Sequence, residues 1–204
     1  MPAHVEAIVA EADARGGLAA ILLTHDHPDH AEAVAPLRAR TRAPLAAAAA
    51  DADIRLADGA RLGPFTAIAT SGHAPDHLAF VSAGVCYSGD AVLGAGSVFM
   101  SPHPGSLAAY LDALSRLRAL GLELIAPGHG PLVTEPDAKL AAYIEHRRER
   151  ERALVAALDD GLRDHDELLD RVWVGVPPAL RPIARATLEA HLDKLAAEGR
   201  LPNV

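Results

Sequence analysis

The chain has 204 residues, of which 50% are hydrophobic and 23% are charged, so its composition is that of a globular protein and excludes a disordered one. Its formal net charge of -8 gives no overall attraction to nucleic acid or to an anionic membrane. The single cysteine, Cys86, excludes an internal disulfide and fits a reducing compartment, so we expect a cytoplasmic protein.

In chain order, the first part of the sequence predicts a helix, a strand and a second helix. The predicted helices are 4–15, with apolar residues at helical spacing, and 31–40, where Pro36 suggests a bend or a break. Between them, 18–23 is typical of a buried strand. Residues 43–50 fit either a helix or a strand, because alanine favours helix whereas the position suits a short strand.

The middle of the chain predicts short strands followed by one amphipathic helix. Turn residues divide 51–73 into β-type runs, and 77–90 is typical of a hairpin. An amphipathic helix over 106–121 and a buried strand over 122–131 follow, and the sequence is helical from about Glu135. Because strands and helices mix without strict alternation, we predict an α/β sandwich followed by a helical unit.

Seven metal-capable side chains follow apolar runs that are predicted strands. They are His25, His27, Asp29, His30, His73, Asp90 and His129. A lone histidine is usually structural or exposed, and a structural zinc site would use four ligands, usually including cysteine. Four donors within six residues, with three more at later strand ends, instead favour a catalytic site. Neutral imidazole and carboxylate are typical ligands of zinc, and iron or manganese also accept them.

The spacing of these donors divides them between two ions. His25 and His27 can point to one metal, whereas Asp29 and His30 can face a second. One carboxylate must bridge the ions, and Asp90 is the natural candidate. Two ions about 3.5–4 Å apart can hold a hydroxide that attacks at neutral pH. The residues therefore predict a hydrolase with two Zn²⁺ ions, or iron or manganese in their place, in which Asp29 and Asp90 are catalytic.

Four segments resemble the ordered motifs of the metallo-β-lactamase superfamily: "THDHPDH", "SGHAPDH", "YSGD" and "APGHGP". The resemblance implies an αββα sandwich with two metal ions. The implied ligands are His25, His27 and His73 at one ion, Asp29, His30 and His129 at the other, and Asp90 as the bridge. No cysteine aligns as a ligand, which resembles the hydrolase branches rather than the antibiotic-resistance lactamases.

Within the superfamily, the chain resembles the β-lactamase-like protein 2 branch, which carries a C-terminal winged helix. The matching segments are "GSLAAYLDALSRLRAL", "YIEHRRERERALVAAL" and "ATLEAHLDKLAAEGRL". We therefore expect a catalytic domain over 1–135, a connecting helix over 136–160 and a small, α-helical winged-helix-like domain over 161–204. The superfamily has several strands before the helix at 4–15, so we expect a catalytic domain that is incomplete at its N-terminus. A homo-oligomer would cover the sheet edge left exposed.

Several other polar residues allow two interpretations. Asp76 and His77 fit either groups that orient His73 or lie near the substrate, or a turn capped by the aspartate. Residues 145–152, "EHRRERER", are typical of a solvated helix face with interleaved charges. In that segment, contact of Arg147 and Arg148 with an anionic substrate is the alternative. We expect three further histidines to be surface groups: His4, His165 and His191.

The predicted activity is hydrolysis of an ester-type bond. The substrate is either a small-molecule thioester or carboxylic ester, or the phosphodiester of single-stranded RNA. Residues 161–204 hold one more acidic than basic residue, whereas DNA-binding winged helices normally present a basic face. We therefore expect this unit to shape a substrate channel. The alternative is an inactive or nucleic-acid-binding fragment that keeps its metal site without turnover. No membrane partner is expected, because the apolar runs fall far short of the about 20 residues of a membrane helix.

Overall fold

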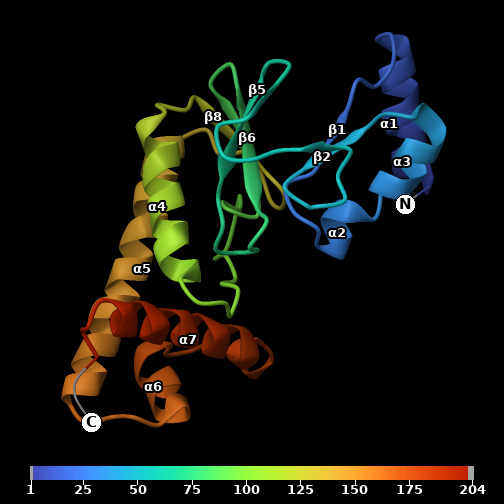
Figure 1. The fold of residues 1–204 in the computed structure, drawn as a ribbon. Coiled ribbons are helices and arrows are strands. Elements are labelled where there is room, and N and C mark those ends of the chain that lie inside the picture. The colour runs from blue at the N-terminus through green and yellow to red at the C-terminus, as the bar shows by residue number, and fades with distance from the viewer. Residues whose placement is uncertain (1, 202–204) are drawn as a thin grey trace.

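The computed structural model describes residues 2–201, in which two sheets lie between two layers of helices (Figure 1). The smaller sheet is parallel and contains β1 (Ile21–Leu22), β2 (Leu45–Ala47) and β3 (Ile54–Arg55). The larger sheet contains β4 (Arg61–Leu62), β5 (Phe65–Ala69), β6 (Leu78–Ser82), β7 (Val85–Gly89) and β8 (Leu124–Pro127). Its neighbouring strands are antiparallel, except for the parallel pair β7 and β8.

The outer layers are two pairs of helices, one on each side of the two sheets (Figure 1). They are α1 (Pro2–Ala14) and α3 (Val34–Thr41) beside the smaller sheet, and α4 (Ser106–Ala119) and α5 (Pro136–Asp159) beside the larger one. One apolar cluster joins α1 and α3 to β1, a second lies between the sheets, and a third joins β5–β8 to α4 and α5. The predicted α/β sandwich is therefore confirmed, with the layer order helix, sheet, sheet, helix.

The C-terminal part of the chain forms a second, helical unit. It contains the end of α5, then α6 (His165–Val172), the 3-10 helix η1 (Pro178–Leu180) and α7 (Arg181–Ala197). The first half of α5 contributes Leu140 and Ile144 to the sandwich core. Its second half contributes Leu154 and Leu158 to a separate apolar cluster with α6 and α7. Among residues 2–201, none of these helices combines the length and hydropathy required to span a membrane.

Two local expectations about the first part of the chain are settled by packing. The segment 43–50 contains a strand, β2, because it pairs with β1 on one side and β3 on the other. The predicted helix over 31–40 is in fact two helices, α2 (Pro28–Ala31) and α3, and the break precedes Pro36. Pro36 lies in the first turn of α3, where its missing N–H would have no partner within the helix.

Candidate metal centre

The segment after β1 carries four of the seven predicted ligands, two in a loop and two in a short helix. The chain leaves β1 and places His25 in the connecting loop. Pro28 begins α2, because its fixed φ suits the first helical position. His27, the residue before it, keeps an extended backbone, whereas Asp29 and His30 lie inside the short helix. The motif is thus divided between a loop and a short helix, and the helical turn at Asp29 and His30 was not predicted from the sequence.

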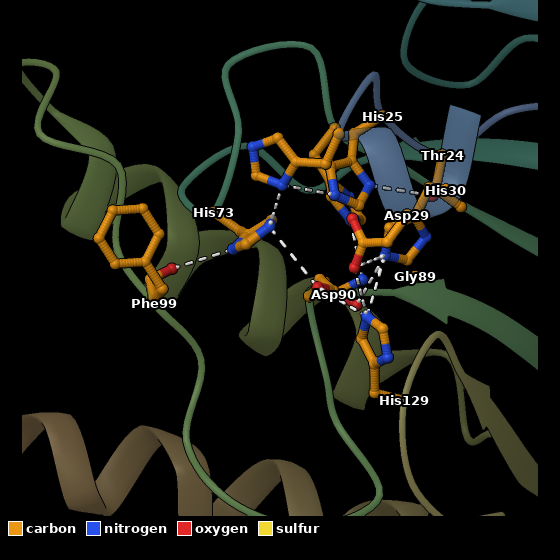
Figure 2. A network of polar contacts seen from close by, with 12 residues as sticks. Thr24, His25, Asp29, His30, His73, Gly89, Asp90, Phe99 and His129 are labelled. Atoms are coloured by element: carbon orange, nitrogen blue, oxygen red, sulfur yellow. Dashed lines mark hydrogen bonds and ion pairs between the residues drawn. The ribbon is translucent and has the colours of Figure 1, made fainter. Parts of the chain in front are cut away.

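The first donor group consists of three imidazoles, those of His25, His27 and His73. The Nδ1 atom of His27 lies 3.1 Å from His25 Nε2 and 3.0 Å from His73 Nε2. His73 Nδ1 lies 3.2 Å from the carbonyl oxygen of Phe99 (Figure 2). Because a carbonyl only accepts, Nδ1 is the donor and Nε2 carries the lone pair that faces the group. Three imidazole nitrogens that converge in this way can share a cation.

Burial keeps two members of this group, His25 and His73, in the neutral form. Burial, together with the neighbouring imidazole of His30, lowers the pKa of His25 to about 3. Burial also lowers the pKa of His73, although its bond to the Phe99 carbonyl acts in the opposite direction. The neutral imidazole is the form that binds a metal. The fold therefore presents these side chains in the protonation state that a metal ligand requires.

The second donor group consists of Asp29, His30 and His129. His129 Nε2 lies 3.2 Å from His30 Nε2 and 3.1 Å from Asp29 Oδ2. The parallel pairing of β7 with β8 brings His129, which follows β8, to the sheet end where Asp90 lies. The side chains of Asp29 and His129 are 59% and 51% exposed. This group therefore opens to solvent, in contrast to the first.

Asp90 lies between the two groups (Figure 2). Its Oδ1 atom is 3.4 Å from His30 Nε2, and its Oδ2 atom is 3.6 Å from both His73 Nε2 and His129 Nε2. Oδ1 is buried without a hydrogen-bond partner among residues 2–201. An unpartnered buried carboxylate oxygen is costly, and a cation would compensate it. The donor set and this oxygen therefore fit two metal ions bridged by Asp90.

Gly89 sets the backbone that delivers Asp90. The β7–β8 register shifts between Tyr87 and Gly89, and Gly89 has a φ of 47°. A Cβ at this position would lie 2.7 Å from Thr24 Oγ1 and 2.9 Å from His77 Nε2. Only glycine combines this positive φ with the space available. The close approach places the next residue, Asp90, at the convergence of the donors.

His77 holds the backbone of Asp90 in place. The Asp90 N–H donates to His77 Nε2 at 3.1 Å, so His77 carries its proton on Nδ1 and donates it to Thr70 Oγ1 at 2.7 Å. The His77 ring is 1% exposed and stacks on His25 with centroids 4.7 Å apart. Burial lowers the pKa of His77 well below its ordinary value. His77 therefore orients a candidate ligand, as one of the two alternatives has it, but that ligand is Asp90 and not His73.

The structure brings all seven predicted side chains into one cluster, and their assignment as metal ligands stays a prediction. Sequence reasoning missed two groups that support the cluster, Phe99 and Thr70. Phe99 acts through its backbone carbonyl, for which no side-chain pattern exists. Thr70 meets His77 because β5 and β6 are antiparallel, and the Thr70 N–H donates to the His77 carbonyl at 2.9 Å.

Two expectations about surface residues are wrong. His191 is fully buried and packs its ring edge against Trp173, with centroids 5.8 Å apart, whereas His4 is exposed and His165 is partly exposed. Arg147 is 4% exposed, because α5 turns it toward the segment after β7, where it donates to the Val98 carbonyl. Both burials depend on segments that are distant in the sequence.

Comparison with known proteins identifies two regions of the chain. Residues 53–129 match the metallo-beta-lactamase superfamily, and residues 165–202 match the beta-lactamase associated winged helix domain. The beta-lactamase-like protein 2 homolog of Drosophila melanogaster is 30% identical over 206 residues, which cover 89% of this chain and 69% of the relative. The atrochrysone carboxyl ACP thioesterase of Aspergillus chevalieri is 31% identical, covering 76% of this chain and 52% of the relative.

Among solved structures, that of TTHA1623 in a di-iron-bound form is 32% identical with a TM-score of 0.55, covering 70% of this chain and 82% of the other. The chain spans about half to two thirds of the length of the curated relatives described above. The sandwich, the ordered histidine and aspartate motifs and the match to the fly relative agree with one another. On these grounds, the chain belongs to the metallo-β-lactamase superfamily.

Proposed function

We propose that this chain is a hydrolase of acyl thioesters and related carboxylic esters that uses two divalent metal ions. The observation that carries the proposal is the meeting of two donor groups at the carboxylate of Asp90. Imidazole nitrogens and carboxylate oxygens suit zinc, and they also suit iron and manganese. Zinc is the first ion to test, and the di-iron form of the TTHA1623 structure makes iron the comparison metal.

Two divalent ions supply this chemistry by lowering the pKa of a coordinated water and by polarising the ester carbonyl. The first ion would be held by His25, His27 and His73, and the second by Asp29, His30 and His129. Asp90 would set the separation of the two ions, because His77 anchors its backbone and its carboxylate lies next to His73 of the first group and to His30 and His129 of the second.

The exposure of the two groups gives them different tasks. The buried first group excludes bulk water, which strengthens the electrostatic interactions there. Asp29 lies on the exposed side, with Oδ2 next to His129. In the proposed reaction, Asp29 Oδ2 orients the attacking water and accepts the proton that it loses. The leaving thiol or alcohol departs through the solvent-exposed second group.

The choice of substrate class is supported by charge and by one relative. A net charge of -8, with no basic excess in residues 161–204, disfavours a polyanion such as RNA. The relative from Aspergillus chevalieri is named as a thioesterase of an acyl carrier protein. A thioester carbonyl is also more reactive toward water than a phosphodiester. These points favour the thioester over single-stranded RNA.

Metal reconstitution with two substrates tests the proposal. The chain is stripped with a chelator, reloaded with zinc, iron or manganese, and assayed for thiol release from an acyl-N-acetylcysteamine thioester and for cleavage of an RNA oligonucleotide. We expect thioester turnover that requires metal and falls roughly 100-fold or more in His27→Ala. The matched control is His4→Ala, an exposed histidine on α1.

The other outcomes assign the chain to the remaining hypotheses. Full metal occupancy without turnover of either substrate would establish the inactive fragment. Cleavage of RNA without thioester turnover would indicate that the chain is a nuclease and not a thioesterase. RNA binding that survives both chelation and His27→Ala would indicate a nucleic-acid-binding protein with a vestigial site.

A further inference from the structure

A cavity of about 360 Å³ lies where the segment after β7 meets the C-terminal helices. We call it the acyl cleft. Its apolar wall consists of Val98, Phe99, Trp173, Val176, Leu180 and Ile183. Leu180 and Ile183 are 48% and 44% exposed, which is high for large apolar side chains. Small-molecule sites typically occupy roughly 300–1,000 Å³ and combine apolar walls with a few polar groups, so the cleft has the size and lining of a ligand site.

The charged part of the lining is positive. Arg147 and Arg150 both line the cleft, and among residues 2–201 no carboxylate does. Arg147 is buried, donates to the Val98 carbonyl and to Ser97 Oγ, and lies over the Tyr110 ring. Arg150 is half-buried and donates to the Val172 carbonyl and to His146 Nε2. Neither arginine forms an ion pair with a carboxylate in that part of the chain. Buried charges in proteins are normally paired. The cleft therefore offers two cations to a ligand that brings the missing negative charge.

The acyl cleft and the metal centre share one neighbouring residue. Phe99 lines the cleft, its carbonyl accepts the hydrogen bond from His73, and its ring centroid lies 6.1 Å from that of His73. Figure 2 shows the Phe99 ring beyond His73, on the side away from Asp90. Phe99 therefore lies at the boundary between the cleft and the donor groups.

We propose that the acyl cleft binds the acyl part of the substrate, an apolar chain or aromatic body that carries an anionic group, and that Arg147 and Arg150 pair with that anion. The naming of the ligand as an acyl group rests on the proposed function. The binding of an amphiphilic organic anion follows from the cleft alone. The helical unit thereby forms one wall of the substrate site and contributes to the choice of substrate.

The only tryptophan of the chain, Trp173, lines the cleft and reports its occupancy directly. Sodium octanoate is titrated into the metal-loaded chain while tryptophan fluorescence is recorded, with octan-1-ol as the uncharged probe of equal length. We expect a saturable change with octanoate and at least about tenfold weaker binding of octanol, since octanol cannot form the ionic hydrogen bonds that the octanoate carboxylate forms with arginine. Arg150→Gln should remove this preference while leaving octanol binding unchanged.

Two charge-introducing variants separate the cleft from the general surface. Ile183→Glu puts a carboxylate at the rim of the cleft and should weaken octanoate binding at least about tenfold. Leu120→Glu is the matched control, because Leu120 is 49% exposed and lies outside the cleft. In the thioester assay, Ile183→Glu should raise KM for a suberoyl thioester, whose distal carboxylate is the anion that the cleft is proposed to bind. Leu120→Glu should leave this KM unchanged.

Failure of this inference is distinguishable from failure of the proposed function. Absence of a saturable signal in the wild-type chain, equal affinity for octanoate and octanol, or equal loss in Leu120→Glu would each overturn the acyl cleft. Octanoate binding that Ile183→Glu abolishes, in a chain without turnover, would support the cleft and overturn only the thioesterase. Thioester turnover by a chain whose tryptophan fluorescence does not respond to octanoate would support the thioesterase and overturn only the acyl cleft.

Discussion

Replacement of His77 by phenylalanine tests whether this ring holds Asp90 through hydrogen bonds. Phenylalanine keeps a flat ring against His25 but removes both ring nitrogens. The Asp90 N–H and the hydroxyl of Thr70, a fully buried residue, are then left without their partners. Each such group costs about 1–3 kcal/mol, so we expect the free energy of unfolding to fall by about 2–6 kcal/mol. Urea unfolding of the metal-free chain, followed by circular dichroism, measures this loss.

The matched variant is Thr70→Val, which keeps the side-chain shape and removes the hydroxyl. Alone, it leaves the Nδ1–H of His77 unsatisfied and should cost about 1–3 kcal/mol. Combined with His77→Phe, it should cost almost nothing, because the ring nitrogens are already gone. If Thr70→Val costs the same in both backgrounds, the hydrogen bond does not exist and the reasoning fails.

Metal binding supplies a second readout for the same ring. A loosened Asp90 should bind its ions more weakly, and loss of a supporting partner typically reduces metal affinity by about 10–100-fold. Calorimetric titration of zinc into His77→Phe and the wild-type chain compares the two affinities. Unchanged zinc affinity in a destabilised variant would refute the positioning of Asp90 and leave His77 as a purely structural residue.

Three further outcomes follow from the same structure. Gly128→Ala places a Cβ 2.6 Å from Asp90 Oδ1 and from the His30 ring, so zinc content measured after gel filtration should fall below two equivalents while the fold, followed by circular dichroism, persists. Chelation should remove metal in two phases, the exposed group of Asp29 and His129 first; a single phase in stopped-flow indicator measurements would contradict this order. Burial lowers the pKa of His191 to about 3, so between pH 6.5 and 3 the unfolded chain binds an extra proton and stability falls as the pH falls. Relative to His191→Leu, the metal-free wild-type chain should therefore lose about 2 kcal/mol between pH 7 and pH 5, as measured by urea unfolding at both values.

Elements whose apolar spacing and turn residues agree could be predicted from the sequence. The hairpin over 77–90 is such a case, because Ala83 and Gly84 take the positive φ values that a tight turn requires. The convergence of the candidate ligands was also predictable, since each follows an apolar run, and they gather where β1 of the smaller sheet and β5, β7 and β8 of the larger sheet end. The alanine-rich segment 43–50 was not, because its strand exists only by pairing with neighbours on both sides.

Residues whose environment is created by distant segments could not be predicted. Arg147 has the sequence neighbours of an exposed helix face, and it is buried by the segment that contains Val98 and by Tyr110 of α4. His191 is similar, because its burial depends on Trp173 and the packing of α7. The role of His77 was left open for the same reason, since its partner is the backbone of Asp90, a contact that sequence patterns do not encode.

Helix α5 runs without interruption for 24 residues, about 36 Å at the usual helical rise. Its residues belong to both apolar clusters, so one continuous helix connects the sandwich to the helical unit. A rotation of that unit relative to the sandwich would require α5 to bend or one of the two clusters to come apart. We therefore expect the cavity lined by α5, α7 and the segment after β7 to keep its shape when a ligand binds. Thermal unfolding should likewise melt both parts together in one cooperative transition.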